Sequence, residues 1–175
     1  MKKLLLAMAA VVALLMTSCG GGLKVEMDNP TNQSITVTID GGKEYTLAPM
    51  ELIPVKGLKK GEHTMQTAGG PELKFTLETS SLLNPTLSTY VTDKEEYSAN
   101  PSNMDDSDWV TVVIDGEEYW GPIEVFENQP VIQLDKINYG ILVDFPEEVD
   151  TRTKVTHTKL FRAVDYPRYY REAYN

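Results

Sequence analysis

Residues 35–45 read ITVTIDGGKEY, in which branched apolar residues alternate with threonines before an Asp-Gly turn. Side chains of a β-strand point alternately to opposite faces, so Ile35, Val37 and Ile39 would share one face. The Asp-Gly pair tolerates the positive φ of a tight turn, after which the chain can return as a second strand. The stretch therefore predicts a β-hairpin with one buried face.

A second stretch of the chain repeats this pattern. Residues 110–119 read VTVVIDGEEY, and beyond the two hairpins residues 54–60 and 130–136 share the pattern P-V-x-x-L-x-K. Hairpins converge readily on the same turn residues, so the turns alone are weak evidence of a repeat. The longer match favours a tandem duplication, in which two small β modules pack together and share a larger core.

Beyond the first 22 residues, the rest of the chain reads as short strands separated by Gly, Pro and Asn, without a sustained helical period. We therefore expect an all-β protein of two small β-sandwich-like modules with a short C-terminal tail, in which Asp165 would cap a short helix. The expected boundaries are β module 1 at 23–92, an acidic linker or loop at 93–108, β module 2 at 109–164 and a Tyr/Arg-rich tail at 165–175.

The N-terminus has the features of an export signal. Two lysines precede a 13-residue apolar run, which is too short to cross a bilayer comfortably, and the only cysteine, Cys19, follows it. This arrangement resembles the lipobox of bacterial, Bacteroidota-type lipoproteins, although Met16 and Thr17 replace the commoner residues. The resemblance implies a lipoprotein signal peptide at 1–18, then a lipidated Cys19 and a glycine tether at 19–22.

Lipidation would hold the protein at a membrane. Each buried methylene of an acyl chain such as palmitate adds about 0.8 kcal/mol of membrane affinity. Gly20 after the cysteine favours the outer membrane over retention at the inner one, and it leaves the periplasmic and surface-facing orientations open. The alternative is an ordinary secretory signal, which would leave an unpaired thiol near the new N-terminus of an exported protein.

Charge is distributed unevenly along the chain. Residues 93–150 carry 16 acidic side chains and only two basic ones, Lys94 and Lys136, whereas residues 152–175 carry six basic and two acidic ones. Nucleic-acid phosphates and anionic lipid surfaces both require clustered Lys and Arg. The acidic body therefore argues against nucleic acid as a partner.

Module 1 contains residues 37–41 (VTIDG), Pro49 and residues 58–65 (LKKGEHTM). In these pieces it resembles the PEGA family of small β-sandwich repeats, although residues 47–48 lack the small polar residue usual before the proline. The second copy lacks the Gly-Glu-His piece. The resemblance implies a non-catalytic extracytoplasmic module with no active site.

Few residues suggest chemistry. His63 and His157 are the only histidines and lie far apart in sequence, so a zinc site would depend largely on carboxylates. Residues 105–108 (DDSD) suit calcium by type but lack the Gly and Glu of an EF-hand loop, which favours a solvated acidic loop. Motifs for a nucleophilic serine, a zinc protease or a phosphate loop are missing. We expect no enzyme, no metal and no cofactor.

Aromatic residues are the remaining candidates for binding. Trp109 and Trp120 belong to the second hairpin, where they would either stack a sugar or fill the core. The tail offers a second, basic and aromatic set: Tyr166, Arg168, Tyr169, Tyr170 and Arg171. This set would either dock a partner or, together with Arg162, pack onto the acids of module 2.

These observations favour a lipid-anchored component of the cell envelope that acts by binding or assembly with a protein partner. The alternative is a glycan-binding accessory lipoprotein of a polysaccharide-uptake system. Exposed, coplanar aromatics would favour the glycan, whereas a free strand edge or a bare apolar patch would favour a protein partner.

Overall fold

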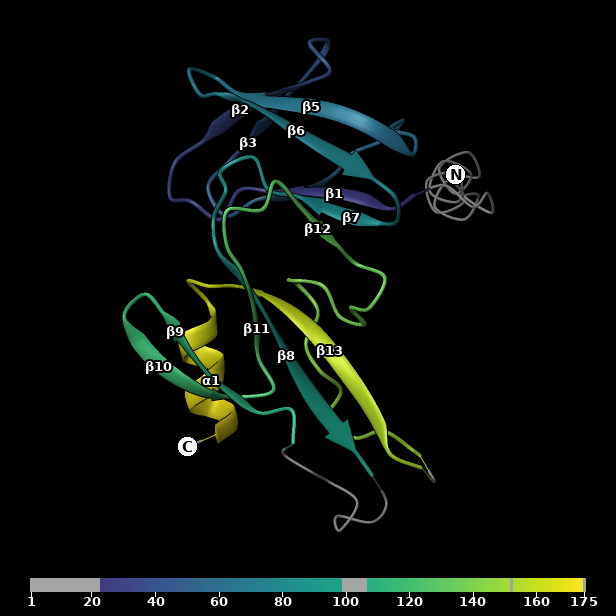
Figure 1. Ribbon diagram of the computed structural model, residues 1–175, viewed down its shortest axis with the longest axis vertical. Helices are drawn as coiled ribbons and strands as arrows, with labels where there is room; N and C mark the ends of the chain where they lie inside the picture. The colour runs from purple at the N-terminus through teal and green to yellow at the C-terminus, as the bar shows by residue number, and fades with distance from the viewer. Residues whose placement is uncertain (1–22, 99–106, 152, 175) are drawn as a thin grey trace, which may run out of the picture.

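The computed structural model describes residues 23–98, 107–151 and 153–174, and β-strands are its main secondary structure (Figure 1). The expected all-β class is confirmed, and one short helix, α1 (Tyr166–Tyr174), lies at the C-terminal end. Within these ranges no helix is long and apolar enough to cross a membrane. The predictions for the signal peptide, Cys19 and the tether concern residues outside them.

Sheet B is antiparallel and comes from the first half of the chain. Its strands in spatial order are β3 (Lys43–Leu47), β2 (Ile35–Ile39), β5 (Gly61–Thr67) and β6 (Glu72–Leu77). The predicted hairpin is β2–β3, and both residues of its Asp-Gly turn have positive φ, 51° and 64°. The turn chemistry therefore decides this part of the fold.

Sheet A combines strands from both halves of the chain. Its strands in spatial order are β12 (Val131–Gln133), β7 (Ser81–Leu83), β1 (Val25–Asp28) and β4 (Leu52–Pro54). The β1–β7 pair is parallel and the other pairs are antiparallel. Strand β12 belongs to the expected module 2 but completes a sheet of module 1. The two expected modules therefore do not form separate sets of sheets.

The second half of the chain forms two further sheets. Sheet C has the antiparallel order β11 (Glu124–Phe126), β8 (Tyr90–Tyr97) and β13 (Val155–Arg162). The fourth sheet is a hairpin of β9 (Val110–Ile114) and β10 (Glu117–Gly121). Figure 1 shows the resulting stack: sheet B, sheet A, sheet C, and then the hairpin with α1.

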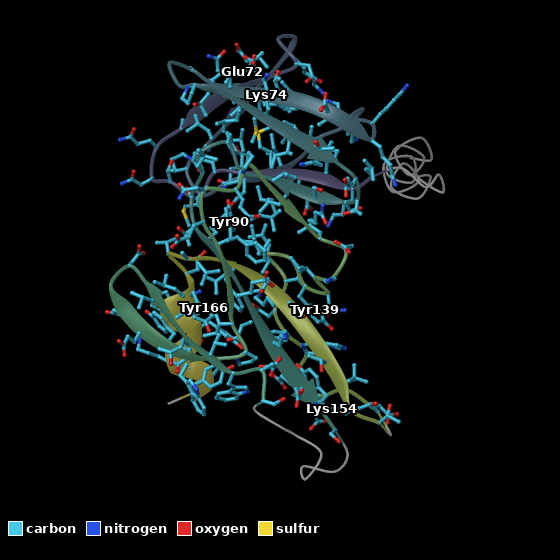
Figure 2. All side chains as sticks on the ribbon, viewed as in Figure 1. Glu72, Lys74, Tyr90, Tyr139, Lys154 and Tyr166 are labelled. Carbon is cyan, nitrogen blue, oxygen red and sulfur yellow. The ribbon has the colours of Figure 1, made fainter. Side chains whose placement is uncertain are left out.

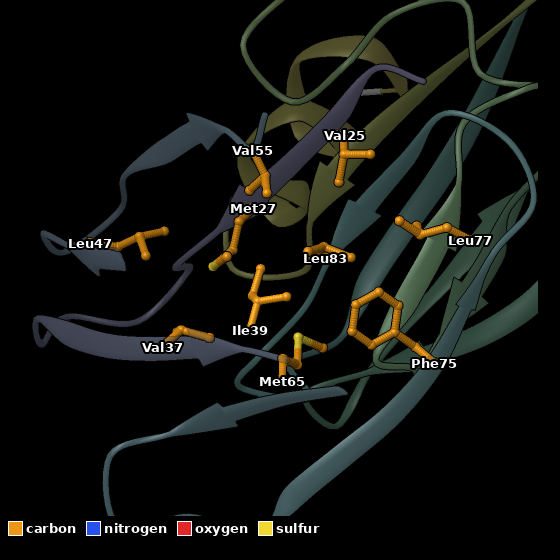
Figure 3. Close-up of a cluster of buried hydrophobic side chains, with 10 residues drawn as sticks. All are labelled: Val25, Met27, Val37, Ile39, Leu47, Val55, Met65, Phe75, Leu77 and Leu83. Atoms are coloured by element: carbon orange, nitrogen blue, oxygen red, sulfur yellow. The ribbon is translucent and has the colours of Figure 1, made fainter. Parts of the chain in front are cut away.

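Alternating side chains connect these layers. Leu83 lies in the core between sheets A and B (Figure 3), whereas its neighbour Leu82 lies in a second core between sheets A and C. Tyr90 joins the second core (Figure 2), and Val91 beside it lies in a third core under the hairpin and α1. Sheets A and C are therefore covered on both faces.

The expected acidic linker at 93–108 begins too early. Residues 93–97 are the second half of β8, a strand that pairs along its whole length with β13. A counter-charge lies beside this acidic strand, since Lys154 contacts Glu96 at 2.6 Å. Composition favoured a loop here because it cannot show which partners the fold will supply.

The two Asp-Gly hairpins are alike only in part. In both cases the strand before the hairpin pairs antiparallel with the strand after it, β1 with β4 and β8 with β11. Beyond that point the topology differs, because β5 adds to β2, whereas no strand of the described chain adds to β9. The P-V-x-x-L-x-K copies also differ in position, since Pro54 ends β4 and Val131 begins β12. The longer sequence match is therefore not a structural equivalence.

Candidate functional site

The β9–β10 hairpin has one buried and one exposed face. A two-residue turn joins Ile114 to Glu117, and the register then pairs Val112 with Tyr119. Ile114 and Tyr119 are buried on the inner face. On the outer face Val113 is 58% exposed and Trp120 is 50% exposed, although side chains of this size usually bury most of their surface.

The inner face is held by the C-terminal helix. The ring of Tyr119 lies 5.4 Å from that of Tyr166 and 5.0 Å from that of Tyr170, both in edge-to-face geometry. Such pairs add roughly 0.5–1.5 kcal/mol beyond the burial of area. The hairpin is therefore fixed from beneath, and its outer side chains stand on a rigid support.

The two candidate tryptophans are brought together. Their ring centroids are 4.3 Å apart with the planes at 60°, and the Trp109 ring also meets that of Tyr174 edge-on at 5.8 Å. Neither indole belongs to the fully buried core. Two rings inclined at 60° do not form the flat surface on which a sugar stacks. The pair is better suited to a partner of irregular, apolar shape.

The two edges of the hairpin differ. The hydroxyl of Tyr170 accepts a bond from the Trp120 amide at 3.2 Å and donates one to the Trp120 carbonyl at 3.0 Å. These contacts satisfy the outward backbone groups of β10 at that residue. Strand β9, in contrast, pairs only with β10 among the strands that the structure describes.

The hairpin itself is rich in acidic side chains. Residues 107–121 carry four acids and no lysine or arginine: Asp108, Asp115, Glu117 and Glu118. Of these, Asp108 contacts Lys94 of β8 at 2.6 Å, and Glu117 accepts a bond from the Tyr119 hydroxyl at 2.8 Å. The exposed apolar face therefore has an acidic rim.

The tail packs on the body by its tyrosines. Tyr166 is fully buried and donates to Asp93 at 2.8 Å, and Tyr174 donates to the same carboxylate at 3.1 Å. Burial raises the pKa of Asp93 to about 6, although the bonds from Tyr166, the Lys94 amide and Tyr174 favour its charged form. Tyr169 lies against Phe161, with ring centroids 4.4 Å apart. Tyr166, Tyr169 and Tyr170 thus all contact the body.

The arginines behave differently from the tyrosines. Arg168 and Arg171 are exposed, and no ion pair is found for either within the described part of the chain. Arg162 was expected to face the acids of module 2, which is wrong. It is buried and binds Asp28 of β1 through two nitrogens, at 2.8 and 2.5 Å. A buried guanidinium needs a buried carboxylate, and Asp28 is the one within reach.

The two histidines have different hydrogen-bond partners. His63 lies between the Asp40 carboxylate and the Lys59 carbonyl, at 2.8 Å from each. His157 instead contacts the Tyr139 hydroxyl at 3.1 Å. In the described ranges no three His, Cys, Asp or Glu side chains gather in a way that could hold a metal ion.

A groove of about 610 Å³ lies beside β11 of sheet C and β12 of sheet A. Both lysines of the acidic segment, Lys94 and Lys136, are among its lining residues. The lining also includes amide, carboxylate and aromatic groups, among them those of Gln129, Gln133, Glu124 and Phe126. Sequence patterns alone did not indicate this groove, because its residues come from four segments that only the fold brings together.

One feature of the sequence indicates the exposed face of the hairpin. In VTVVI, residues 110–114, a strict alternation would place a polar residue at position 113, but the chain has a valine there. Val113 is therefore an apolar residue at an outward position, on the same exposed face as Trp120. No known protein family, curated protein or solved structure matches this chain.

Proposed function

We propose that this protein is a membrane-anchored, extracytoplasmic and non-catalytic binding component that recruits a protein partner through the outer face of its β9–β10 hairpin. One observation carries the proposal: Val113 and Trp120 project from that face at 58% and 50% exposure. Large apolar side chains that gather on a fixed support commonly mark an interaction surface.

The aromatic geometry favours a protein over a glycan at this face. The planes of Trp109 and Trp120 are inclined at 60°, so they offer a ridge and not a flat platform. Among the described strands only β10 pairs with β9, so β9 has a second edge of backbone amides and carbonyls. A strand of a protein can pair with this edge, whereas a sugar cannot.

The anchor rests on the sequence resemblance at Cys19. Strand β1 begins at Val25, at the right of the view in Figure 1, whereas the hairpin lies at the left. Cys19→Ala should release the protein from the outer-membrane fraction or leave its precursor uncut. Fractionation and migration identical to wild type would refute the anchor.

Capture of native partners from detergent-solubilised membranes tests the binding role. Trp120→Ala should lose a partner that the wild-type protein retains, because the hairpin face loses its largest apolar side chain. Leu142→Ala is the matched control, since Leu142 is also exposed, at 69%, but lies outside the hairpin. Recovery of the same partners by all three proteins would contradict the proposal.

The groove between sheets A and C favours a second candidate, the glycan-binding accessory lipoprotein. Amides, carboxylates and ammonium groups around Phe126 supply the hydrogen bonds and apolar contact that a saccharide uses. Calorimetric titration with a panel of oligosaccharides tests it, with Gln133→Ala expected to weaken any binding. If the Gln133→Ala variant binds a sugar with the same heat as the wild-type protein, the sugar binds outside this groove.

A further inference from the structure

The outer edge of β9 has backbone groups that point away from the hairpin. A two-residue turn makes Ile114 and Glu117 a hydrogen-bonded pair, so the next pairs alternate and Val113 and Thr111 occupy non-hydrogen-bonded positions. The amide and carbonyl of such residues face away from the partner strand. Trp120, which is paired with Thr111, supports this register, because Tyr170 binds its backbone from the outside.

This edge lacks the features that usually block strand addition. Residues 110–114 contain no charge, no proline and no glycine, and Val110 and Val113 are exposed at 45% and 58%. Within the described chain the edge of β10 is occupied at Trp120 by Tyr170, and no strand occupies the edge of β9. The protein thus binds one edge of the hairpin at Trp120 and leaves the five residues of β9 as a template along the other.

We propose that β9 accepts an extended strand of a partner protein that alternates apolar residues with lysine or arginine. The inference rests on the proposed protein-binding function and names its partner class. Main-chain bonds to Thr111 and Val113 would supply affinity, and the apolar side chains would pack beside Val113 and Trp109. Asp108 is already paired with Lys94, so Asp115, Glu117 and Glu118 are the acids of the hairpin that favour a basic strand.

A second copy of this chain is a poorer occupant. Pairing β9 with β9 would bring two identical acidic rims together, and like charges at an interface oppose association. An acidic or neutral strand would lack the charge attraction that a basic one gains. The charge of the hairpin therefore decides among the occupants that its backbone alone would admit.

Three synthetic peptides test the proposal against the full-length protein in a neutral detergent. The first alternates Lys and Val over about eight residues, a common strand length. The second replaces Lys with Glu, and the third is N-methylated on alternate residues so that one edge loses its donors. We expect the first to bind and to change tryptophan fluorescence, the second not to bind, and the third to bind about tenfold more weakly.

Two variants at one position give the matched protein control. Val113→Pro removes an outward amide while keeping the ladder to β10, and should weaken the Lys/Val peptide about tenfold. Val113→Thr keeps the amide and should bind within about threefold of wild type. Circular dichroism checks that both variants fold. Should Val113→Pro fail to fold, the N-methylated peptide still decides the question with the wild-type protein.

Several results would overturn the inference. No binding of the Lys/Val peptide, equal binding of the N-methylated form, or unchanged affinity of a folded Val113→Pro variant would each exclude strand addition. Light scattering that shows a dimer dissolved by Val113→Pro would make a second copy the occupant. If Trp120→Ala loses a native partner and Val113→Pro retains it, the hairpin still binds proteins and only strand addition is wrong. If neither variant changes partner recovery, the proposed function fails as well.

Discussion

Two buried charged residues connect the halves of this molecule. Asp28 of β1 binds Arg162 of β13 and also accepts a bond from the Tyr90 hydroxyl at 2.8 Å. The second guanidinium nitrogen reaches the Met50 carbonyl at 3.0 Å. Tyr90 and Arg162 belong to two different strands of sheet C, so the Asp28 carboxylate joins sheet A to sheet C.

Breaking this pair should be costly. Asp28→Ala leaves the buried Arg162 guanidinium with only the partly exposed Asp165 carboxylate, 3.9 Å away, as a counter-charge. We expect the free energy of unfolding in urea to fall by about 3–5 kcal/mol. The double variant Asp28→Leu with Arg162→Met removes both charges and should be clearly more stable than the sum of the single changes predicts. Strictly additive losses would show that the two side chains do not stabilise each other.

Asp93 predicts a pH dependence. Burial raises its pKa from 3.8 to about 6, with Glu95 acting in the same direction. A folded-state pKa above the unfolded value means that folding favours the protonated acid. The contribution is therefore fully present below about pH 4 and is lost as the pH rises through about 6, a change of roughly 3 kcal/mol.

Urea unfolding of wild type and Asp93→Asn across this window measures the effect. The difference between the two proteins isolates Asp93 from other groups, such as His63, whose pKa is also raised through its bonds to Asp40 and Lys59 despite the opposing effect of burial. We expect the wild-type protein to lose stability relative to the variant as the pH rises. A difference that stays constant with pH would contradict the buried position of the carboxylate.

At the scale of single elements, the tail helix is the clearest test of the packing. Removal of the chain after Val164 deletes Tyr166 and uncovers Tyr119 and Phe161, so the melting temperature should fall by several degrees or more. High salt should remove only a small part of this difference, because aromatic burial outweighs exposed charges.

The double variant Arg168→Ala with Arg171→Ala is the control for charge. Both arginines are exposed, so we expect a change in the free energy of unfolding within about 0.5 kcal/mol. A truncated protein that melts like wild type but fails to bind a membrane partner would make the tail a docking segment.

Elements with local turn chemistry could be predicted from the sequence, and elements that depend on distant partners could not. The Asp-Gly hairpins and the helix after Asp165 were predicted because their signals lie within a few residues. The second half of strand β8, residues 93–97, reads as a linker because its acids are matched by Lys154 and by hydroxyls from α1, far along the chain. The candidate tryptophans were placed in one site, but their exposure depends on how the hairpin docks.

A short tripeptide occurs twice in the chain and forms the same kind of turn each time. Asn29 and Asn84 each begin the tripeptide Asn-Pro-Thr. Both are fully buried, and each donates to the carbonyl four residues ahead and to a carbonyl that directly precedes a proline, Ala48 in one case and Gln129 in the other. These two turns carry the chain from β1 to β2 and from β7 to β8. This repeat, unlike the P-V-x-x-L-x-K match, has the same structural role at both of its positions.

At the scale of the whole molecule, the layers share their cores. Sheet A takes β12 from the second half of the chain, and its Leu82 side chain lies in the same core as Tyr90 and Leu160 of sheet C. Cutting between residues 92 and 93 would divide β8 and remove β12 from the edge of β7. Neither half would then keep a complete set of layers.

A fragment of residues 23–92 should therefore fail to fold. It would expose the face of sheet A around Leu82 and leave Asp28 without Arg162, so it would lose apolar burial and a charge partner together. The mature chain, in contrast, should unfold in urea in one transition that circular dichroism and tryptophan fluorescence report at the same midpoint. Fluorescence comes from Trp109 and Trp120 near the hairpin, whereas circular dichroism reports all sheets, so the two signals sample different layers. A folded 23–92 fragment with its own cooperative melt, or two separate transitions in the mature chain, would mean that the first module is an independent domain and that the shared cores add little to its stability.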